Sequence, residues 1–493
     1  MKRLFLYCSI LLSVIALGAC DDSDSFSSSA SNTLTFSTDT VKMDTLFSNV
    51  ASSTYSFWVY NNSGDGIIVE QVRLQKGNQT GFRVNVDGEY LDNTLGSLVN
   101  DIKVRKDDSI RVFVELTATT TGEDTPQLIE DNLVFSLESG VTQYVCLQAY
   151  AWDAVLCDSV VIREDSVMSL TKPVVIYTGM TVDSGVTLTI NAPTTLYFHD
   201  GAGIDVYGTL VVNRDNVGTD VVMRGDRMDH MFDYLPYDRV SGQWKGIRIH
   251  PSSWDNYISN ADIHSSEYGI TCDSVGYDSL KSKITLENVV IHNCKGAGFE
   301  SFNSNVTLVN CQVSNTLGDC VGIYGGKALI VYCTFAQFYP FDADRGAALR
   351  FTNFVDDYDY PLYLMECYNT LVTGYDEDVI YGETNDSTVS FGYYFSNSVL
   401  RTEKPDTASL NSDLYNNIIW ETSEDSIEGK DHFTLVDEDN LCYDFTLDSL
   451  STAIDSAMVI SAYPTDRKGT TRGDRPDIGC YEYVSPVTTE DPQ

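Results

Sequence analysis

A repeat of 22 residues in the second half of the chain restricts the fold more than any other feature. The segment Ile284–Ile291 (ITLENVVI) is followed at this spacing by Val306–Val313 (VTLVNCQV) and then by Ala328–Phe335 (ALIVYCTF). A repeat near 20 residues with strand-length apolar runs is typical of one turn of a parallel β-helix. Earlier runs around Gly185 and Gly203, 18 residues apart, follow the same pattern. The sequence therefore predicts a parallel β-helix over residues 172–483, including a C-terminal cap.

Equivalent positions of successive coils should lie directly above one another, because neighbouring coils pair at about 4.8 Å. The tight turn in each coil needs a residue that tolerates left-handed backbone, and asparagine is the usual non-glycine choice. We expect an asparagine ladder, interrupted by Tyr332 and Glu366, that contains Asn288, Asn310, Asn397 and Asn416. The coil register over residues 340–390 is left open, because the repeat is weak there.

The position after each ladder residue predicts a second column, formed by Val289, Cys311, Cys333 and Cys367. Stacked cysteines favour either a ladder of disulfides or metal-bound thiols, or a column of small apolar core residues. The core interpretation is preferred because cysteine often packs as a small apolar residue. The chain has no CxxC pair of the kind that holds zinc.

The residues before the repeat alternate apolar and polar residues in short runs, such as Tyr55–Tyr60 and Ile110–Leu116. Turn-forming residues separate the runs, as in Asn61–Gly66. About seven strands at this spacing predict an immunoglobulin-like β-sandwich over residues 32–155. With 30 tyrosines and no long helical pattern after residue 20, the whole chain is expected to be all-β. We expect the sandwich to act as a spacer.

The first 20 residues have the pattern of an export signal. Lys2 and Arg3 precede an apolar run that is too short to span a membrane, and the run ends in Leu17-Gly18-Ala19-Cys20. This ending resembles a bacterial lipobox, so residues 1–20 are predicted to be a lipoprotein signal peptide and Cys20 to be lipidated. Several acyl chains on one cysteine would anchor the protein in a membrane. Residues 21–31 are acidic and serine-rich, which predicts a flexible tether.

The order of lipobox, acidic tether, sandwich and coils resembles that of β-helix lipoproteins of Bacteroidota over nearly the full length. The most specific residues lie at the end, where Arg472–Tyr483 (RGDRPDIGCYEY) is similar to a closing segment called a choice-of-anchor domain. Thr452, Ala457 and Cys480 depart from its usual residues. The resemblance implies a right-handed, pectin-lyase-like solenoid on the outer face of the outer membrane. We expect the closing segment to cover the open end of the solenoid, because that end exposes an unpaired edge, and residues 484–493 to form a disordered tail.

The chain carries 31 Lys and Arg against 71 Asp and Glu, a formal net charge of −40. Such a surface repels nucleic acid and acidic polysaccharides, so nucleic acid is excluded as a partner. The expected partners are the membrane, through the lipid on Cys20, and glycans; the protein is expected to be a monomer. No cofactor is predicted apart from Ca²⁺, for which Asp356, Asp357 and Asp359 form a candidate loop. An exposed acidic turn is the favoured interpretation of that loop.

The best candidate for catalysis is a histidine pair. His264 and His292 occupy equivalent positions in the repeat, so they should lie on adjacent coils and face outward. Lys295 is the third candidate, and Glu267 and Arg248 are expected nearby. Two coincidental histidines on a solvated face are the favoured alternative.

Three functions follow from these patterns. The first is a surface module that binds glycans through outward tyrosine side chains, which suit sugar stacking, without catalysing a reaction. The second is a polysaccharide lyase or glycoside hydrolase, because parallel β-helices host such enzymes, although a fold does not specify a reaction. The third is an adhesin. We predict no lyase activity, because a lyase needs positive groups around an acidic substrate and the chain is strongly negative.

Overall fold

The computed structural model describes residues 25–214, 218–274, 276–405 and 413–485. The predicted signal peptide, Cys20, residues 21–24 of the tether and residues 486–493 of the predicted tail lie outside this range. The chain divides into two compact units, residues 1–153 and 154–493. In the described part of the tether, Phe26 pairs with Gly66, so this stretch contacts the first unit and does not run free as expected. None of the described helices is long and apolar enough to span a bilayer.

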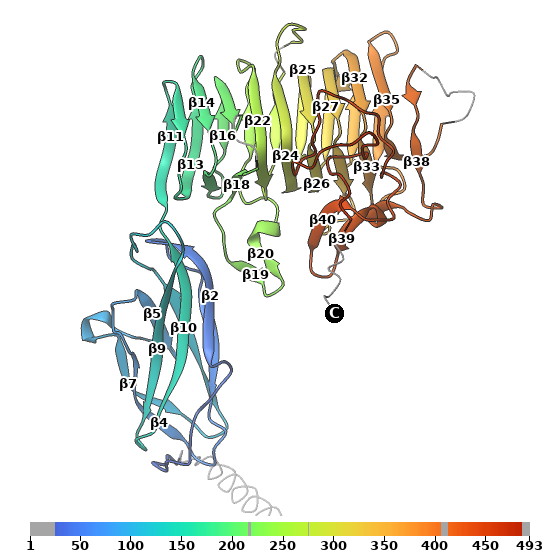
Figure 1. Cartoon of the computed structure of the whole chain (residues 1–493). Coiled ribbons are helices and arrows are strands. Elements are labelled where there is room, and N and C mark those ends of the chain that lie inside the picture. Colours follow the sequence, from blue (N-terminus) through green and yellow to red (C-terminus); the bar gives the residue numbers. More distant parts are fainter. Residues whose placement is uncertain (1–24, 215–217, 275, 406–412, 486–493) are drawn as a thin grey trace, which may run out of the picture. The chain divides into compact units, whose positions relative to one another are not determined.

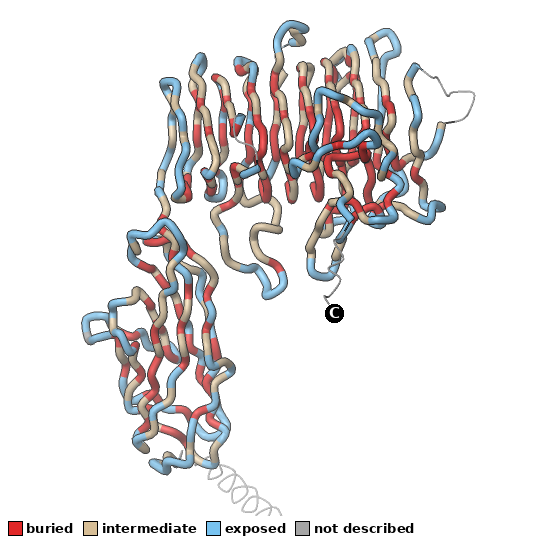
Figure 2. Tube along the Cα trace, viewed as in Figure 1, coloured by how far each residue is buried: buried red, intermediate tan, exposed pale blue. Residues whose placement is uncertain are grey.

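The first unit consists of two five-stranded sheets around one apolar core (Figures 1 and 2). One sheet has the strand order β1 (Thr35–Phe36), β3 (Tyr55–Tyr60), β8 (Ser109–Leu116), β5 (Phe82–Val86), β6 (Glu89–Tyr90). The other has the order β2 (Thr40–Phe47), β10 (Thr142–Trp152), β9 (Gln127–Leu137), β4 (Ile67–Leu74), β7 (Leu98–Val104). A short 3₁₀ helix, η1, spans Asn93–Leu95. Alternating inward residues fill the core, as the sequence pattern requires. The immunoglobulin-like classification stays a prediction.

The second unit is a parallel β-helix whose strands stack in three columns, here called sheets 1, 2 and 3 (Figure 1). Sheet 1 contains β11 (Val155–Ile162), β13 (Val174–Val182), β15 (Thr195–Phe198), β18 (Val221–Gly225), β22 (Asn256–His264), β24 (Ile284–Cys294), β26 (Gln312–Thr316), β28 (Thr334–Gln337), β33 (Leu371–Gly374), β36 (Val399–Arg401) and β38 (Ile419–Glu421). Sheet 2 contains the later parts of β11 and β13, then β16 (Ile204–Val206), β21 (Ile247–Ile249), β23 (Ile270–Cys272), β25 (Phe299–Val309), β27 (Val321–Val331), β29 (Leu349–Thr352) and β34 (Ile380–Glu383).

Sheet 3 contains β12 (Ser166–Met168), β14 (Thr187–Ile190), β17 (Thr209–Val212), the first parts of β22 and β24, the later parts of β25 and β27, then β32 (Leu362–Tyr368), β35 (Phe391–Ser396) and β37 (Tyr415–Asn416). Three hairpins lie outside these sheets: β19 (His230–Phe232) with β20 (Leu235–Pro236), β30 (Phe354–Val355) with β31 (Tyr358–Asp359), and β39 (Phe433–Asp437) with β40 (Cys442–Leu447). The 3₁₀ helices η2 and η3 span Tyr237–Arg239 and Gly429–His432. The all-β prediction is confirmed.

The register confirms the 22-residue repeat in the middle coils, where Ile284 pairs with Val306 and Val306 with Ala328. Two expectations about the early coils are wrong. The residue above Gly203 belongs to the coil in which Met180 pairs with Ile204, so the true spacing is 24 residues and Gly185 is not its partner. The first coil also begins earlier than residue 172, because β11 already pairs in parallel with β13.

The asparagine ladder lies at the corner between sheets 3 and 1. Asn288, Asn310 and Asn397 all have left-handed backbone, and the Asn310 side chain donates to Asn288 Oδ1 at 3.1 Å. Tyr332 interrupts the ladder as expected and also has a positive φ of 52°. Two members were misplaced: the ladder positions are held by Asn369 and Asn417. Glu366 and Asn416, which were expected there, pair within sheet 3 instead.

The cysteine column is only partly as predicted. Cys311 and Cys333 follow the ladder residues and lie buried in the core, but Cys367 pairs with Ile330 inside sheet 3. Thr370 takes the equivalent position, because it follows Asn369. The ten cysteines in the described part of the chain are all free thiols. They therefore act as small apolar core residues there, as the preferred interpretation holds.

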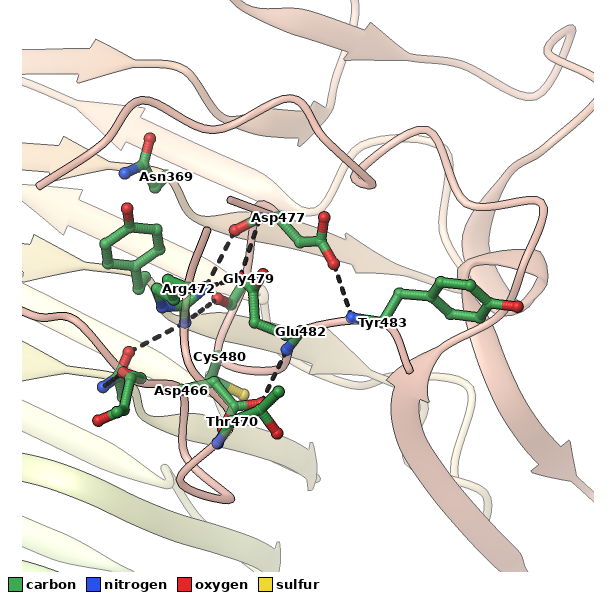
Figure 3. A network of polar contacts seen from close by, with 12 residues as sticks. Asn369, Asp466, Thr470, Arg472, Asp477, Gly479, Cys480, Glu482 and Tyr483 are labelled. Carbon is green, nitrogen blue, oxygen red and sulfur yellow. Dashed lines mark hydrogen bonds and ion pairs between the residues drawn. The ribbon is translucent and has the colours of Figure 1, made fainter. Parts of the chain in front are cut away.

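The closing segment was expected to cover the open end of the solenoid, but its contacts follow the flank of the coils. Figure 3 shows its polar network, in which the Arg472 guanidinium donates to Asp477 O and Gly479 O. Arg472 also donates to Asn310 Oδ1 at 3.1 Å and stacks on the Tyr332 ring at 3.8 Å. The segment is therefore fastened to the asparagine ladder, whose amides would otherwise face water at this corner.

Candidate functional site

The histidine pair lies on the outer side of sheet 1, where β22 and β24 are in register. His264 pairs with His292 on the adjacent coil, and their rings stack with centroids 4.7 Å apart. Asp262 joins them because residues two apart on a strand point to the same side. Its Oδ1 lies 2.8 Å from His264 Nδ1 and 3.3 Å from His292 Nε2. This carboxylate was missed by the sequence analysis, although the alternation of β22 could have indicated it.

The surroundings of the pair differ from the solvated face that was expected. His264 is buried, and only His292 and Asp262 are partly exposed. Burial lowers the pKa of His264, which favours its neutral form. Burial alone would raise the pKa of Asp262, but the charges and hydrogen bonds of the two imidazoles outweigh it and hold this pKa well below its ordinary value.

A cavity of about 480 Å³ lies beside Asp262 and His292, between sheet 1 and the closing segment. The coil side contributes Gln312, Ser314 and Asn315, and the closing segment contributes Tyr443 and Tyr481. The hydroxyl of Tyr481 donates to Gln312 Oε1 at 2.8 Å. The two parts of the chain therefore form one polar pocket around the exposed edges of the pair.

The other residues expected near the histidines lie elsewhere. Lys295 is exposed, with its side chain against Gly242, and does not line the cavity. Arg248 and Glu267 line a different pocket, on sheet 2. The expected constellation therefore does not assemble, because the strand that carries the histidines and the strand that carries Arg248 belong to different sheets.

The candidate cation loop is the tip of the hairpin β30–β31. Asp356, Asp357 and Asp359 are all exposed there. Among the described residues, the group of three or more potential metal ligands that lie close together is Asp262, His264 and His292. The favoured interpretation of an exposed acidic turn agrees with this geometry, and Ca²⁺ binding stays an untested prediction.

A second site, which the sequence did not predict, is a groove of about 530 Å³ on the outer side of sheet 2, here called the sheet 2 groove. Its floor is a column of outward side chains from four successive coils: Asp205, Arg248, Thr271 and Glu300. At about 4.8 Å per coil the floor extends over roughly 14 Å, the length of a short oligosaccharide. One wall is formed by Lys245, Glu267 and Tyr268, and the other by Asp273 and Phe302.

The wall residues come close together because glycine occupies the corner before each strand. A Cβ on Gly246, whose φ is +94°, would lie 1.6 Å from Tyr268 O. A Cβ on Gly296 would lie 2.5 Å from Tyr268 Cε1, so this glycine leaves room for the tyrosine ring. Tyr268 keeps 43% of its surface exposed. An exposed ring held above a polar floor is the arrangement that sugar rings stack on.

The charged groups of the sheet 2 groove hold one another in place. Arg248 Nε donates to Asp273 Oδ2 at 2.9 Å, and His250 Nε2 lies 2.7 Å from Asp205 Oδ1. Glu300 has no cation of this kind; it accepts a hydrogen bond from the Thr271 hydroxyl at 2.9 Å. Burial, together with the nearby charges of Asp319 and Asp273, raises the pKa of Glu300. The groove thus combines a carboxyl that tends to keep its proton with an ion-paired carboxylate on the adjacent coil.

The comparisons with known proteins support the solenoid. Residues 245–353 match the family described as right handed beta helix region. No curated protein matches the chain. Similar solved structures include the catalytic unit of a GH87 alpha-1,3-glucanase from Streptomyces thermodiastaticus, with 9% identity, 74% of this chain and 88% of that chain covered, and a TM-score of 0.27.

Two further similar structures are small domains. The PapD-like domain 7 of human CEP192 has 9% identity, with 24% of this chain and 86% of that chain covered and a TM-score of 0.17. The CooA pilin subunit from enterotoxigenic Escherichia coli has 12% identity, with 24% and 98% covered and a TM-score of 0.17. These likenesses are too weak to assign an activity. The family match does establish that residues 245–353 form a right-handed β-helix region.

Proposed function

We propose that this chain is a surface lipoprotein that binds neutral glycans in the sheet 2 groove. The observation that carries the proposal is the groove itself, in which the exposed Tyr268 ring and the Phe302 ring stand above a floor of hydrogen-bonding side chains. Carbohydrate sites combine ring faces, which stack on sugars, with polar groups that bond to hydroxyls. No other described surface was needed to reach this proposal.

The charge of the groove favours neutral sugars. Lys245 and Arg248 face four carboxylates, those of Asp205, Glu267, Asp273 and Glu300, and Arg248 is already paired. A polyuronate would therefore meet repulsion from the groove and from the net charge of −40. The same balance supports the prediction that the protein is not a lyase for acidic polysaccharides.

A glycan array with the full chain tests binding, and two tyrosine variants locate it. Tyr268→Ala should weaken binding of the best glycan by roughly tenfold or more, because it removes the stacking ring. Tyr358→Ala removes an exposed ring of the same solenoid, on the hairpin β30–β31, and should leave the affinity unchanged. Equal affinities of the two variants, or an array with no binding, would contradict the proposal.

Glycoside hydrolysis is the second candidate function, and one observation favours it. Hydrolases of this class use a carboxylic acid to protonate the leaving oxygen and a second carboxylate as base or nucleophile. Glu300, with its raised pKa, suits the first role, and Asp273 on the adjacent coil suits the second. Release of reducing ends from a bound glycan should then be lost in Glu300→Gln and kept in Glu267→Gln, which changes an exposed groove carboxylate. Binding without any release of reducing ends would leave the first function alone.

The location of the protein is proposed from its N-terminal sequence. The lipobox ending in Cys20 and the acidic residues after it support a lipid anchor on the outer face of an outer membrane. The sandwich would then serve as a spacer, and the closing segment resembles that of Bacteroidota lipoproteins. Metabolic labelling with a fatty-acid analogue should mark the native chain but not Cys20→Ala, and protease added to intact cells should remove the anchored protein. Equal labelling of both chains would contradict the anchor.

A further inference from the structure

The cluster of Asp262, His264 and His292 has a geometry that its hydrogen bonds alone do not require. A single carboxylate oxygen, Asp262 Oδ1, lies within 3.3 Å of nitrogens from two different imidazole rings. One potential ligand atom from each residue lies within 4.8 Å of the other two. The cluster is on sheet 1 and shares no lining residue with the sheet 2 groove.

The spacing of the three atoms fits a metal ion. Imidazole nitrogens and carboxylate oxygens bind Zn²⁺ at about 2.0–2.2 Å, which separates neighbouring ligand atoms by roughly 2.9–3.4 Å in octahedral to tetrahedral arrangements. The observed separations from Asp262 Oδ1, 2.8 Å to His264 Nδ1 and 3.3 Å to His292 Nε2, lie close to this range. In a bound state the two nitrogens would present lone pairs to the ion, and the ring protons would sit on the other nitrogens.

The backbone imposes this convergence. Asp262 and His264 are separated by the core residue Ile263, so both point out of the coil, and the parallel register places His292 directly beside His264. The stacked rings hold the two nitrogens on the same side of the sheet. A site built on paired strands is rigid, so little ordering is needed when an ion binds.

A second observation points to a ligand at the same place. The cavity of about 480 Å³ reaches Asp262 and His292, so part of the coordination sphere faces open space. Asn315 lines this cavity, is 2% exposed, and its Oδ1 has no hydrogen-bond partner. A water on the ion, or a further ligand beside it, would give such an oxygen a partner.

The charged groups around the cavity do not oppose a cation. Arg467 pairs with Asp220 at 2.7 Å, and Arg239 donates to the carbonyl of Asn440. Lys468 lies over the ring of Tyr481. The strong negative charge of the whole chain also raises the local concentration of cations.

We propose that Asp262, His264 and His292 bind a divalent first-row transition-metal ion, with Zn²⁺ as the ion to test, and leave its remaining positions open to the cavity. Two imidazoles and one carboxylate are a donor set of zinc and of non-haem iron, whereas Ca²⁺ takes six to eight oxygen ligands. The site is independent of glycan binding in the sheet 2 groove.

The test is a titration of the full chain, without a polyhistidine tag, with Zn²⁺ and separately with Ca²⁺. The native chain should bind one equivalent of Zn²⁺ at this site and no Ca²⁺ there, and Co²⁺ should give the visible absorption bands of a site with nitrogen and oxygen ligands. His292→Ser is the informative variant, because β26 already carries Ser314 at the equivalent position and the coil should accept it. It should weaken Zn²⁺ binding by roughly 100-fold or more, since even loss of a group that only orients a ligand costs about 10- to 100-fold.

His199→Ser is the matched control. His199 lies 2.7 Å from Asp226 on the same solenoid, but it is an exposed pair without a third ligand. This variant should bind Zn²⁺ like the native chain, and Zn²⁺ should raise the melting temperature of both but not that of His292→Ser. The proposal is overturned if the native chain binds no stoichiometric Zn²⁺, or if His292→Ser is folded and retains the native affinity.

Discussion

Replacing Arg472 by alanine should release the closing segment from the flank of the solenoid. The Arg472 side chain is 3% exposed and its partner Glu482 is 10% exposed, so the pair is shielded from water. The same guanidinium donates to Asn310 Oδ1 and Gly479 O, and it stacks on Tyr332. The substitution would leave Glu482 buried without its cation. Removal of one partner of a buried ion pair costs about 3–5 kcal/mol.

Hydrogen exchange measures this cost where it should arise. A loss of about 3–5 kcal/mol corresponds to a roughly 100- to 4,000-fold larger open population, because each 1.4 kcal/mol is a factor of ten. The amides of Ile478 and Gly479, which bond to Ala453 O and Asn369 O, should exchange faster by that factor. Amides of β10 in the first unit should not change, because they belong to a separate compact unit.

Arg475→Ala provides the control within the same segment. The Arg475 side chain is 73% exposed and lies 3.4 Å from an Asp455 carboxylate that is also partly exposed. Exposed pairs contribute about 0–1 kcal/mol, so exchange should rise by no more than roughly fivefold. If Arg472→Ala behaved like Arg475→Ala, the closing segment would be held by its apolar contacts and the role given to Arg472 would be refuted.

Three further predictions follow from the solenoid. Asn310→Ala should lower the free energy of unfolding by about 2–3 kcal/mol in urea titrations, because it strains a left-handed residue and removes ladder bonds; Asn310→Gly, which relieves the strain, should recover about 1 kcal/mol. Burial alone would raise the pKa of Glu421, but its buried partners, among them Arg401, lower it, so its stabilising contribution should be complete at neutral pH and disappear as pH falls below the ordinary range of a glutamate; Glu421→Gln should show a lower melting temperature at pH 7 and a smaller loss on acidification. The buried Cys333, whose thiol pKa is raised by burial, should resist alkylation until the coils unfold, whereas the half-buried Cys442 should react in the native state, as peptide mapping by mass spectrometry would show.

The solenoid could be predicted where the repeat is regular. Coils of 22 residues place like residues above one another, so Asn288 and Asn310 fell into one column without any structural information. The prediction failed where insertions change the coil length. The hairpin β30–β31 lengthens one coil until Ala328 pairs with Met365, and this moved the ladder from the expected Glu366 to Asn369.

The two sites differ in the same way. His264 and His292 were recognised because their strands have nearly identical sequences around them, and their contact follows from register alone. The floor of the sheet 2 groove joins Asp205, Arg248 and Glu300, whose coils differ in length and whose strands are only a few residues long. No sequence pattern connects these residues. The burial that raises the pKa of Glu300 also depends on neighbours that only the fold brings together.

The most direct test of the proposed function is a crystal structure of the full chain with the glycan that the array selects. We predict electron density for sugar rings along the floor from Asp205 to Glu300, with one ring stacked on Tyr268. Sugar bound elsewhere on the molecule, with the sheet 2 groove filled only by water at saturating glycan, would contradict the assignment of this groove as the binding site.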